Sequence, residues 1–201
     1  MIQIATGPKQ NRSSTRHRLS DNVPVISVVL NDDLTALLEQ AVTLCRHRLF
    51  IATADVKDLH MPGALSSRGG SACSIVDIFR DLGQRGVQVS LLHSGVPSGP
   101  FLAQLKHGLP QTLSMRRCVR VHIKAIIADG KRMYLGSANL TGAGLGAKGP
   151  RRRNFEGGIW TDELALIDPV ADMLEEVYSG AHCKTCGRRE HCPVPLEEPE
   201  L

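Results

Sequence analysis

Six residues of particular types fall at set spacings in the middle of the chain. A histidine and a lysine stand two apart, an aspartate follows five residues later, and Gly-Ser-x-Asn begins seven residues after that. An imidazole can act as a nucleophile or move protons near neutral pH, and an ammonium can hold an anion. A lysine is costly to bury without a partner, so the pattern predicts a polar cleft. The six residues are His122, Lys124, Asp129, Gly136, Ser137 and Asn139.

The surrounding residues predict a β-hairpin that positions this group. Residues 121–130 are mostly apolar, and side chains alternate across a strand, so His122 and Lys124 are expected on one face. Residues 129–130 predict a tight turn and 131–135 the returning strand. An isolated His-x-Lys pair more often reflects a core histidine and a lysine at a strand end. The full six-residue string makes a chance match improbable.

The string resembles the signature of the phospholipase D superfamily, the phosphodiesterases known for a His, Lys and Asp motif. Among them the chain is most similar to the small bacterial endonuclease-like members. A further match lies at residues 154–159, where members often carry an acidic residue that hydrogen-bonds the motif histidine. The resemblance is specific over residues 121–159 and looser over 24–120. It is absent from the first twenty residues and from the cysteine-bearing end.

The resemblance implies in-line attack on a phosphodiester. Such a site needs a nucleophile, an acid for the leaving oxygen, and groups that hold the charged non-bridging oxygens. His122 is then the nucleophile and forms a phosphohistidine. Lys124 and Asn139 are expected to hold the phosphate oxygens, and Ser137 to donate to them. Glu156 is expected to orient the imidazole and to stabilise its charged form.

The motif occurs once in full, which leaves one role unfilled. The family's reaction uses two histidines, and the other His-x-Lys, at residues 182–184, lacks the residues that should follow it. Small members of the family build one site across a two-fold dimer, so a homodimer is expected here. Asp129 belongs to the motif, but strand alternation points it away from His122. We therefore expect Asp129 to be mainly structural.

Basic residues are concentrated around the motif. Between Lys106 and Arg153 there are eleven Lys or Arg and one acidic residue, although the whole chain has a formal net charge of only +4. This concentration predicts a face that binds a polyanion. The run Arg151, Arg152 and Arg153 is the candidate substrate-binding loop, although a simple linker is equally compatible with it. Nucleic acid, DNA rather than RNA, is the expected partner.

A nuclease is therefore the leading hypothesis. A phospholipid phosphodiesterase or transphosphatidylase is the alternative, because it would use the same chemistry. That alternative calls for an apolar entry surface, and aromatic residues make up only 3% of the chain. A binding module with a decayed site is a third possibility, which the intact motif disfavours. The family's reaction implies no cofactor for catalysis.

The composition is that of one ordinary domain. Hydrophobic residues make up 42% of 201, which supports a sizeable core. No apolar run approaches eighteen residues, so no membrane span is expected. The N-terminal residues are too polar for a signal peptide, which makes the cytoplasm the default location.

Apolar periodicity predicts strands alternating with helices. This order indicates an α/β domain in which helices flank a mixed β-sheet on both faces. The expected parts are a basic flexible segment (1–22), a phospholipase D-like catalytic domain (23–180) and a Cys/His-containing tail (181–201). The expected strands cover 25–30, 49–54, 86–93, the motif hairpin and 155–161. The expected helices cover 34–48, 74–83, 101–107 and about 168–178.

The tail carries a second set of residues with chemical potential. Cys183 and Cys186 have the spacing of a zinc knuckle, Cys192 offers a third thiolate, and His191 or His182 a fourth ligand. Structural zinc is the leading interpretation, and an iron–sulfur cluster or free thiols remain alternatives. The other cysteines are interpreted as ordinary buried thiols: Cys45, Cys73 and Cys118.

Overall fold

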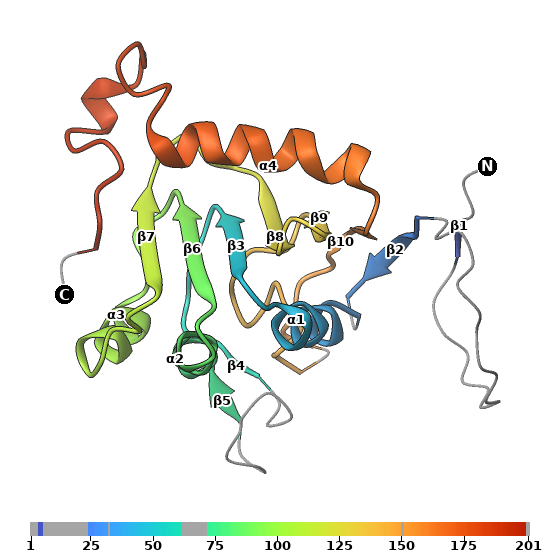
Figure 1. Ribbon diagram of the computed structural model, residues 1–201. Coiled ribbons are helices and arrows are strands. Elements are labelled where there is room, and N and C mark those ends of the chain that lie inside the picture. The colour runs from blue at the N-terminus through green and yellow to red at the C-terminus, as the bar shows by residue number, and fades with distance from the viewer. Residues whose placement is uncertain (1–3, 6–23, 32, 62–71, 150, 200–201) are drawn as a thin grey trace, which may run out of the picture.

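The computed structural model of the protein describes residues 4–5, 24–31, 33–61, 72–149 and 151–199 (Figure 1). The strands are β1 (Ile4–Ala5), β2 (Ile26–Leu30), β3 (Arg48–Thr53), β4 (His60–Met61), β5 (Cys73–Ser74), β6 (Gln88–His93), β7 (Leu113–Arg117), β8 (Lys124–Ala128), β9 (Arg132–Gly136) and β10 (Gly157–Thr161). The helices are α1 (Asp33–Leu44), α2 (Ile75–Gln84), α3 (Gly99–Lys106) and α4 (Leu164–Ser179), with a short 3-10 turn at Arg189–His191.

One mixed sheet organises the fold. Its strand order is β1-β2-β10-β9-β8-β3-β6-β7, and β4 and β5 form a separate two-stranded ribbon. The strands from β2 to β3 in this order pair antiparallel, whereas β6 and β7 run parallel to β3. Parallel neighbours need crossover connections, which α2 and α3 provide. The predicted α/β class with a mixed sheet is confirmed.

Helices cover both faces of the sheet. Figure 1 shows α4 across one face and α1, α2 and α3 against the other. The side chains of β8 alternate between the two resulting cores, as expected for a strand. Ile126 and Ala128 belong to the core with α1 and α2, and Ala125 and Ile127 belong to the core under α4, which contains Ile167.

The motif strand starts later than predicted. The predicted strand includes residue 121, but β8 begins at Lys124. The backbone first turns at Cys118, whose carbonyl accepts the N–H of Val121 at 3.0 Å. Residues 118–123 therefore form a loop that leads from β7 into β8. His122 lies exposed on this loop, while Lys124 is buried as the first residue of the strand.

Helix α4 begins at Leu164, earlier than the predicted start near residue 168. The side chain of Glu163 caps the helix by accepting the N–H of Ala165 at 3.1 Å. Pro169 lies inside the helix and costs it one backbone hydrogen bond near its start. Ile167 is fully buried, and packing its side chain against the sheet stabilises the early turn.

Both described ends of the chain lie at the edges of the sheet. At one edge, β1 pairs parallel with β2; the rest of the predicted flexible segment 1–22 lies outside the described residues. At the other edge, the backbone N–H of Arg117 donates to the carbonyl of Glu197 at 3.0 Å. The tail therefore folds back onto the end of β7.

Candidate active site

His122 and Lys124 lie together where the loop 118–123 enters the sheet. Lys124 is 8% exposed, and its Nζ donates to the backbone carbonyl of His122 at 2.7 Å. The same Nζ lies 3.5 Å from Nδ1 and 3.4 Å from Nε2 of the His122 ring. A buried ammonium and an exposed imidazole therefore share one small space. The two side chains thus lie together as expected, but His122 precedes β8, so the turn of the loop and not strand alternation brings them together.

The hairpin register brings the Gly-Ser-x-Asn group beside Lys124. Lys124 pairs with Gly136, so Ser137 follows immediately beyond the end of the ladder. A Cβ on Gly136 would lie 2.5 Å from the carbonyl oxygen of Gly157, so only glycine fits there. The motif glycine thus allows β9 and β10 to approach closely next to the site.

Asn139 holds the segment that follows β3. Its Oδ1 accepts hydrogen bonds from the backbone N–H groups of Ala54 at 3.1 Å and Asp55 at 3.2 Å. Thr53 also donates to Oδ1 through its hydroxyl, at 3.2 Å. With the carbonyl oxygen used in this way, the side chain's donor capacity lies in its Nδ2 group. Asn139 thus joins the ends of β3 and β9.

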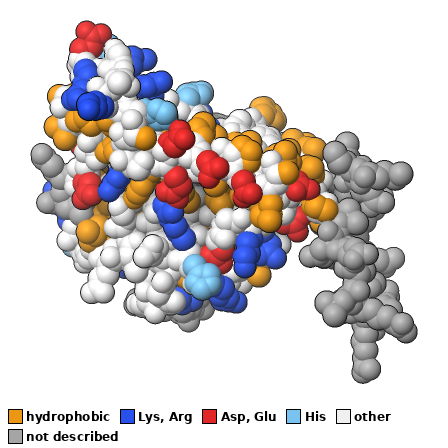
Figure 2. Space-filling model, turned by 45° about the horizontal axis from the view of Figure 1, so that its top comes forward, with side chains coloured by type: hydrophobic (Ala, Val, Ile, Leu, Met, Phe, Trp, Pro, Cys, Tyr) orange, Lys and Arg blue, Asp and Glu red, His pale blue; other side chains and the backbone are white. Residues whose placement is uncertain are grey.

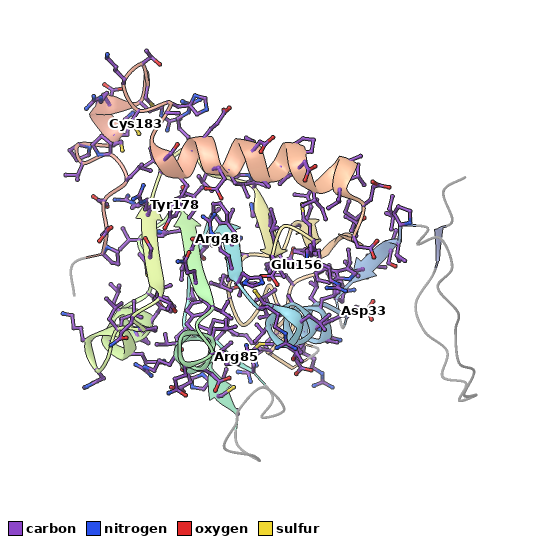
Figure 3. All side chains as sticks on the ribbon, in the orientation of Figure 1. Asp33, Arg48, Arg85, Glu156, Tyr178 and Cys183 are labelled. Carbon is purple, nitrogen blue, oxygen red and sulfur yellow. The ribbon has the colours of Figure 1, made fainter. Side chains whose placement is uncertain are left out.

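Glu156 contacts Ser137 rather than His122. The hydroxyl of Ser137 donates to the Glu156 carboxylate, and Asn154 donates to the same carboxylate through Nδ2 at 2.9 Å. The N–H of Gly157 donates in turn to the Ser137 hydroxyl at 3.1 Å. Glu156, labelled in Figure 3, comes from the segment just before β10. We expected Glu156 to orient the imidazole of His122; in this chain its carboxylate contacts Ser137, which lies next to it because Gly158 of β10 pairs with Gly136 of β9.

Asp129 is not part of this group. It lies at the opposite end of β8, with a positive φ of 54° in the hairpin turn. Its carboxylate accepts the backbone N–H groups of Arg46, His47 and Arg48 at 2.8, 2.8 and 2.9 Å. Burial alone would raise the pKa of Asp129, but these donors outweigh it and lower that pKa to about 2. Asp129 thus fixes the connection between α1 and β3, which agrees with the structural role expected for it.

The arginine run lies close to the motif in the chain and in space. Arg151 and Arg152 are exposed, in a turn where the N–H of Arg152 donates to the carbonyl of Gly149 at 2.8 Å. The next anchor is Asn154, whose N–H donates to the carbonyl of Ala143 at 3.0 Å. Asn154 also donates to the carboxylate of Glu156, which accepts the hydroxyl of Ser137. The arginine run is therefore connected to Ser137 through Asn154 and Glu156.

Only part of the concentrated positive charge is available to a polyanion. Arg116 donates to the carbonyl of Tyr178 at 2.6 Å, Arg117 forms an ion pair with Glu197, and Arg120 contacts the thiol of Cys186. These arginines fasten the C-terminal part of the chain instead. Figure 2 shows acidic and apolar side chains along α4, so the outer surface of that helix does not form the predicted basic face. Its acidic residues are Asp168, Asp172, Glu175 and Glu176.

A cavity of about 420 Å³ opens beside His122. The loop 118–123 forms one side of it, and apolar residues of α4 such as Met173 and Val177 form another. His182 also lines this cavity. The sequence analysis offered His182 as a metal ligand but discounted it as a catalytic residue, because the rest of the motif does not follow it. Spacing alone gave no sign that the fold would place it beside His122.

A second, much smaller cavity contains the cysteines of the tail. Its volume is about 20 Å³, and its lining includes Cys183, Cys186 and Cys192 together with Cys118. His191, a predicted ligand, pairs instead with Glu190 at 3.1 Å. Partial burial, followed by the neighbouring thiols of Cys118, Cys183 and Cys186, raises the pKa of Cys192. The interpretation of Cys118 as an ordinary buried thiol was incomplete, because nothing in the sequence relates residue 118 to the tail.

Comparison with known proteins identifies the family. A family model described as "Cardiolipin synthase, PLD-like domain" matches residues 56–178, more than half of the chain. The chain therefore belongs to the phospholipase D-like superfamily of phosphodiesterases. The match contains the motif hairpin and most of α4. No curated protein matches the sequence.

Solved structures share the fold at low sequence identity. NucT from Helicobacter pylori superposes with a TM-score of 0.57 at 16% identity, covering 77% of this chain and 95% of that one. Nuc from Salmonella typhimurium, a phospholipase D family member, gives 0.55 at 16%, covering 77% and 93%. Phosphatidylserine synthase from Haemophilus influenzae gives 0.50 at 15%, covering 78% of this chain but 39% of that one. No helix in the described residues is long and apolar enough to cross a membrane.

Proposed function

We propose that this protein is a nuclease, which cleaves phosphodiester bonds of nucleic acid, DNA in preference to RNA. The observation that carries the proposal is that His122 and Lys124 lie beside the start of the Ser137–Asn139 turn, near the exposed Arg151 and Arg152. Family membership supports phosphodiester chemistry at this place. The arginine run supplies the positive charge that a phosphate backbone favours.

The proposed reaction begins with attack of a ring nitrogen of His122 on phosphorus. A nitrogen–phosphorus bond forms while the bond from phosphorus to the leaving oxygen breaks, and that oxygen takes up a proton. Lys124 neutralises charge on the non-bridging oxygens, and the Nδ2 group of Asn139 donates to them. Water then attacks the phosphohistidine, loses a proton, and releases the phosphate end and the free imidazole.

The leaving oxygen requires an acid placed opposite the nucleophile. One His122 cannot occupy both positions, so we infer that a second copy of the chain supplies its own His122 across a two-fold axis. The single complete motif supports this arrangement, and the shared fold covers 95% of NucT and 93% of Nuc but only 39% of phosphatidylserine synthase. His182, which lines the cavity beside His122, is the competing intrachain donor.

A phospholipid phosphodiesterase is the second candidate, and one observation favours it. The cavity beside His122 is lined by Val121, Ile123 and apolar residues of α4, which an acyl or glycerol group could contact. The arginine run argues for the nuclease, because a string of cations matches a repeating phosphate chain better than a single headgroup.

The deciding experiment offers plasmid DNA, single-stranded DNA, RNA and phospholipid vesicles to the same preparation, with and without magnesium. We expect cleavage of DNA without added magnesium, and loss of activity by about 10²–10⁴-fold in His122→Ala, the range typical for a catalytic histidine. His107→Ala, an exposed histidine at the end of α3, is the matched control. Cleavage of vesicles alone would favour the phospholipid phosphodiesterase. Activity in His122→Ala would exclude His122 as the nucleophile.

A further inference from the structure

Four cysteines from two distant parts of the chain line one small cavity. Three belong to the tail, and the fourth lies on the loop that follows β7. We call them the four-cysteine cluster, and they are Cys118, Cys183, Cys186 and Cys192. Figure 1 shows how the tail turns back beyond the end of α4 toward β7, and Figure 3 labels Cys183 in this region. The fold thus brings together thiols that are more than sixty residues apart in the sequence.

The cavity has the size and chemistry of a metal site. Its volume of about 20 Å³ is enough for a single ion or water molecule. Four sulfur ligands in tetrahedral arrangement are what a structural zinc ion prefers. We propose that the four-cysteine cluster binds one structural zinc ion, with Cys118 as its fourth ligand.

The turn between the first two tail cysteines has the form of a zinc knuckle. The N–H of Cys186 donates to the carbonyl of Cys183 at 3.3 Å, which closes the turn. The backbone N–H of Arg188 donates to the thiol of Cys186, and Arg120 donates to the same sulfur through Nη1 at 3.7 Å. Donors aimed at a sulfur stabilise its thiolate form, the form that ligates metal.

The charge around the cavity suits a zinc ion with four thiolates. Such a centre has a net charge of −2, which is costly to hold at a partly buried position unless cations lie nearby. Three arginines line the cavity: Arg117, Arg120 and Arg189. Arg117 also forms an ion pair with Glu197, so the tail after Cys192 is drawn to the same place.

The histidines of the tail point to other partners. His182 lies 3.1 Å from the carboxylate of Glu176, and His191 lies 3.1 Å from that of Glu190. In the part of the chain that the structure describes, no three His, Cys, Asp or Glu side chains are already arranged to hold a metal ion. Zinc binding therefore requires rotation of the cysteine side chains, which brings their sulfurs to about 2.3 Å from the ion.

This site would tie the tail to the catalytic loop. Cys118 and His122 belong to the same loop, and the carbonyl of Cys118 accepts the N–H of Val121. A zinc ion on Cys118 would therefore fix the start of the loop that presents His122. The metal would have no part in the reaction itself, so its loss should loosen the loop without removing any reacting group.

The test measures metal content in the full chain purified without added metal. We expect about one zinc per chain by elemental analysis, with zinc lost in Cys118→Ser and in Cys183→Ser, and retained in His191→Ala. Cys73→Ser is the matched control, because Cys73 is buried in β5, where it pairs with Met61 of β4, away from the cluster. Zinc retained in Cys118→Ser, or lost in His191→Ala, would overturn the ligand set.

Cobalt substitution tests the ligand set even where a serine variant fails to fold. Cobalt(II) in a four-sulfur site gives strong sulfur-to-metal charge-transfer absorption. In Cys118→His, which keeps a ligand at that position, the band should weaken and shift, and the metal content should stay near one. An unchanged spectrum would exclude Cys118. Iron with acid-labile sulfide, or no metal with all four thiols titratable, would overturn the zinc proposal while leaving the proposed nuclease intact.

Discussion

The Nζ of Lys124 donates to the backbone carbonyl of His122 at 2.7 Å, and the same nitrogen lies 3.4 Å from Nε2 of the His122 ring. One buried cation therefore both fastens the loop to the first residue of β8 and faces the candidate nucleophile. A lysine can do both because its ammonium has three donors and no acceptor. Both contacts require the lysine to follow the histidine closely in the sequence, and one intervening residue satisfies this.

Replacing Lys124 by methionine should abolish catalysis while leaving the fold intact. The charge that neutralises phosphate oxygens is lost, and removal of one such group typically lowers turnover about 10²–10³-fold. The buried stem remains packed, so the thermal midpoint should fall only by the loss of the bond to the His122 carbonyl. Steady-state turnover and circular dichroism measure the two effects. Lys131→Met, exposed at the other end of the hairpin, is the control, and equal turnover of both variants would contradict the proposed role.

If two chains form one active site, inactive chains should lower the activity of wild-type chains. When His122→Ala chains are mixed with wild type and subunits exchange, activity per wild-type chain should fall as the mutant fraction rises, because only wild-type pairs are complete. Constant activity per wild-type chain, with exchange demonstrated, would mean that each chain works alone. His182→Ala should then be inactive if His182 is the intrachain acid, and active if it is not.

Asp129→Asn should destabilise the fold without removing a reacting group. The carboxylate accepts three backbone N–H groups, and an amide cannot replace its charge, so the loss is on the order of 1–2 kcal/mol after allowance for partial exposure. Activity per folded molecule should stay within about threefold of wild type. Denaturant unfolding together with turnover gives both values. A large loss of turnover at unchanged stability would place Asp129 in the reaction after all.

The same residue gives a pH dependence of known sign. Its pKa of about 2 in the folded state lies below the ordinary value of about 4, so the ionised form favours folding. This contribution is complete above about pH 4 and is lost as the pH falls toward 2. The difference in unfolding free energy between wild type and Asp129→Asn should therefore shrink over that range. A difference that is constant with pH would contradict the assignment.

Substitution of Arg151, Arg152 and Arg153 by alanine should weaken nucleic-acid binding and its salt dependence. Each lost phosphate contact flattens the slope of log K against log salt by about 0.9 for duplex DNA. The matched control removes the same charge at the far end of the hairpin, with alanine at Arg46, Lys131 and Arg132. Binding titrations at several salt concentrations compare the two. An equal slope change in both would show that net charge, not the loop, is responsible.

The sequence by itself determined the family, the α/β class and the chemistry of the motif. Each rests on local information: a string of residue types, alternation along a strand and periodicity along helices. The side on which Ile126 and Ala128 point, opposite to Ala125 and Ile127, follows from the two-residue period of a strand, and the two cores of the fold confirm it. The structural expectation for Asp129 followed from the same alternation.

Only the tertiary structure decided which distant residues meet. The contact of Glu156 with Ser137, the place of His182 in the cavity beside His122, and the entry of Cys118 into the cysteine cavity all join segments that no local pattern relates. The sequence also did not show that Arg116, Arg117 and Arg120 contact the C-terminal part of the chain. A count of charges does not say which cations form contacts within the protein. Sequence spacing sets which side chains share a face, whereas strand order and the path of the tail set which faces come together.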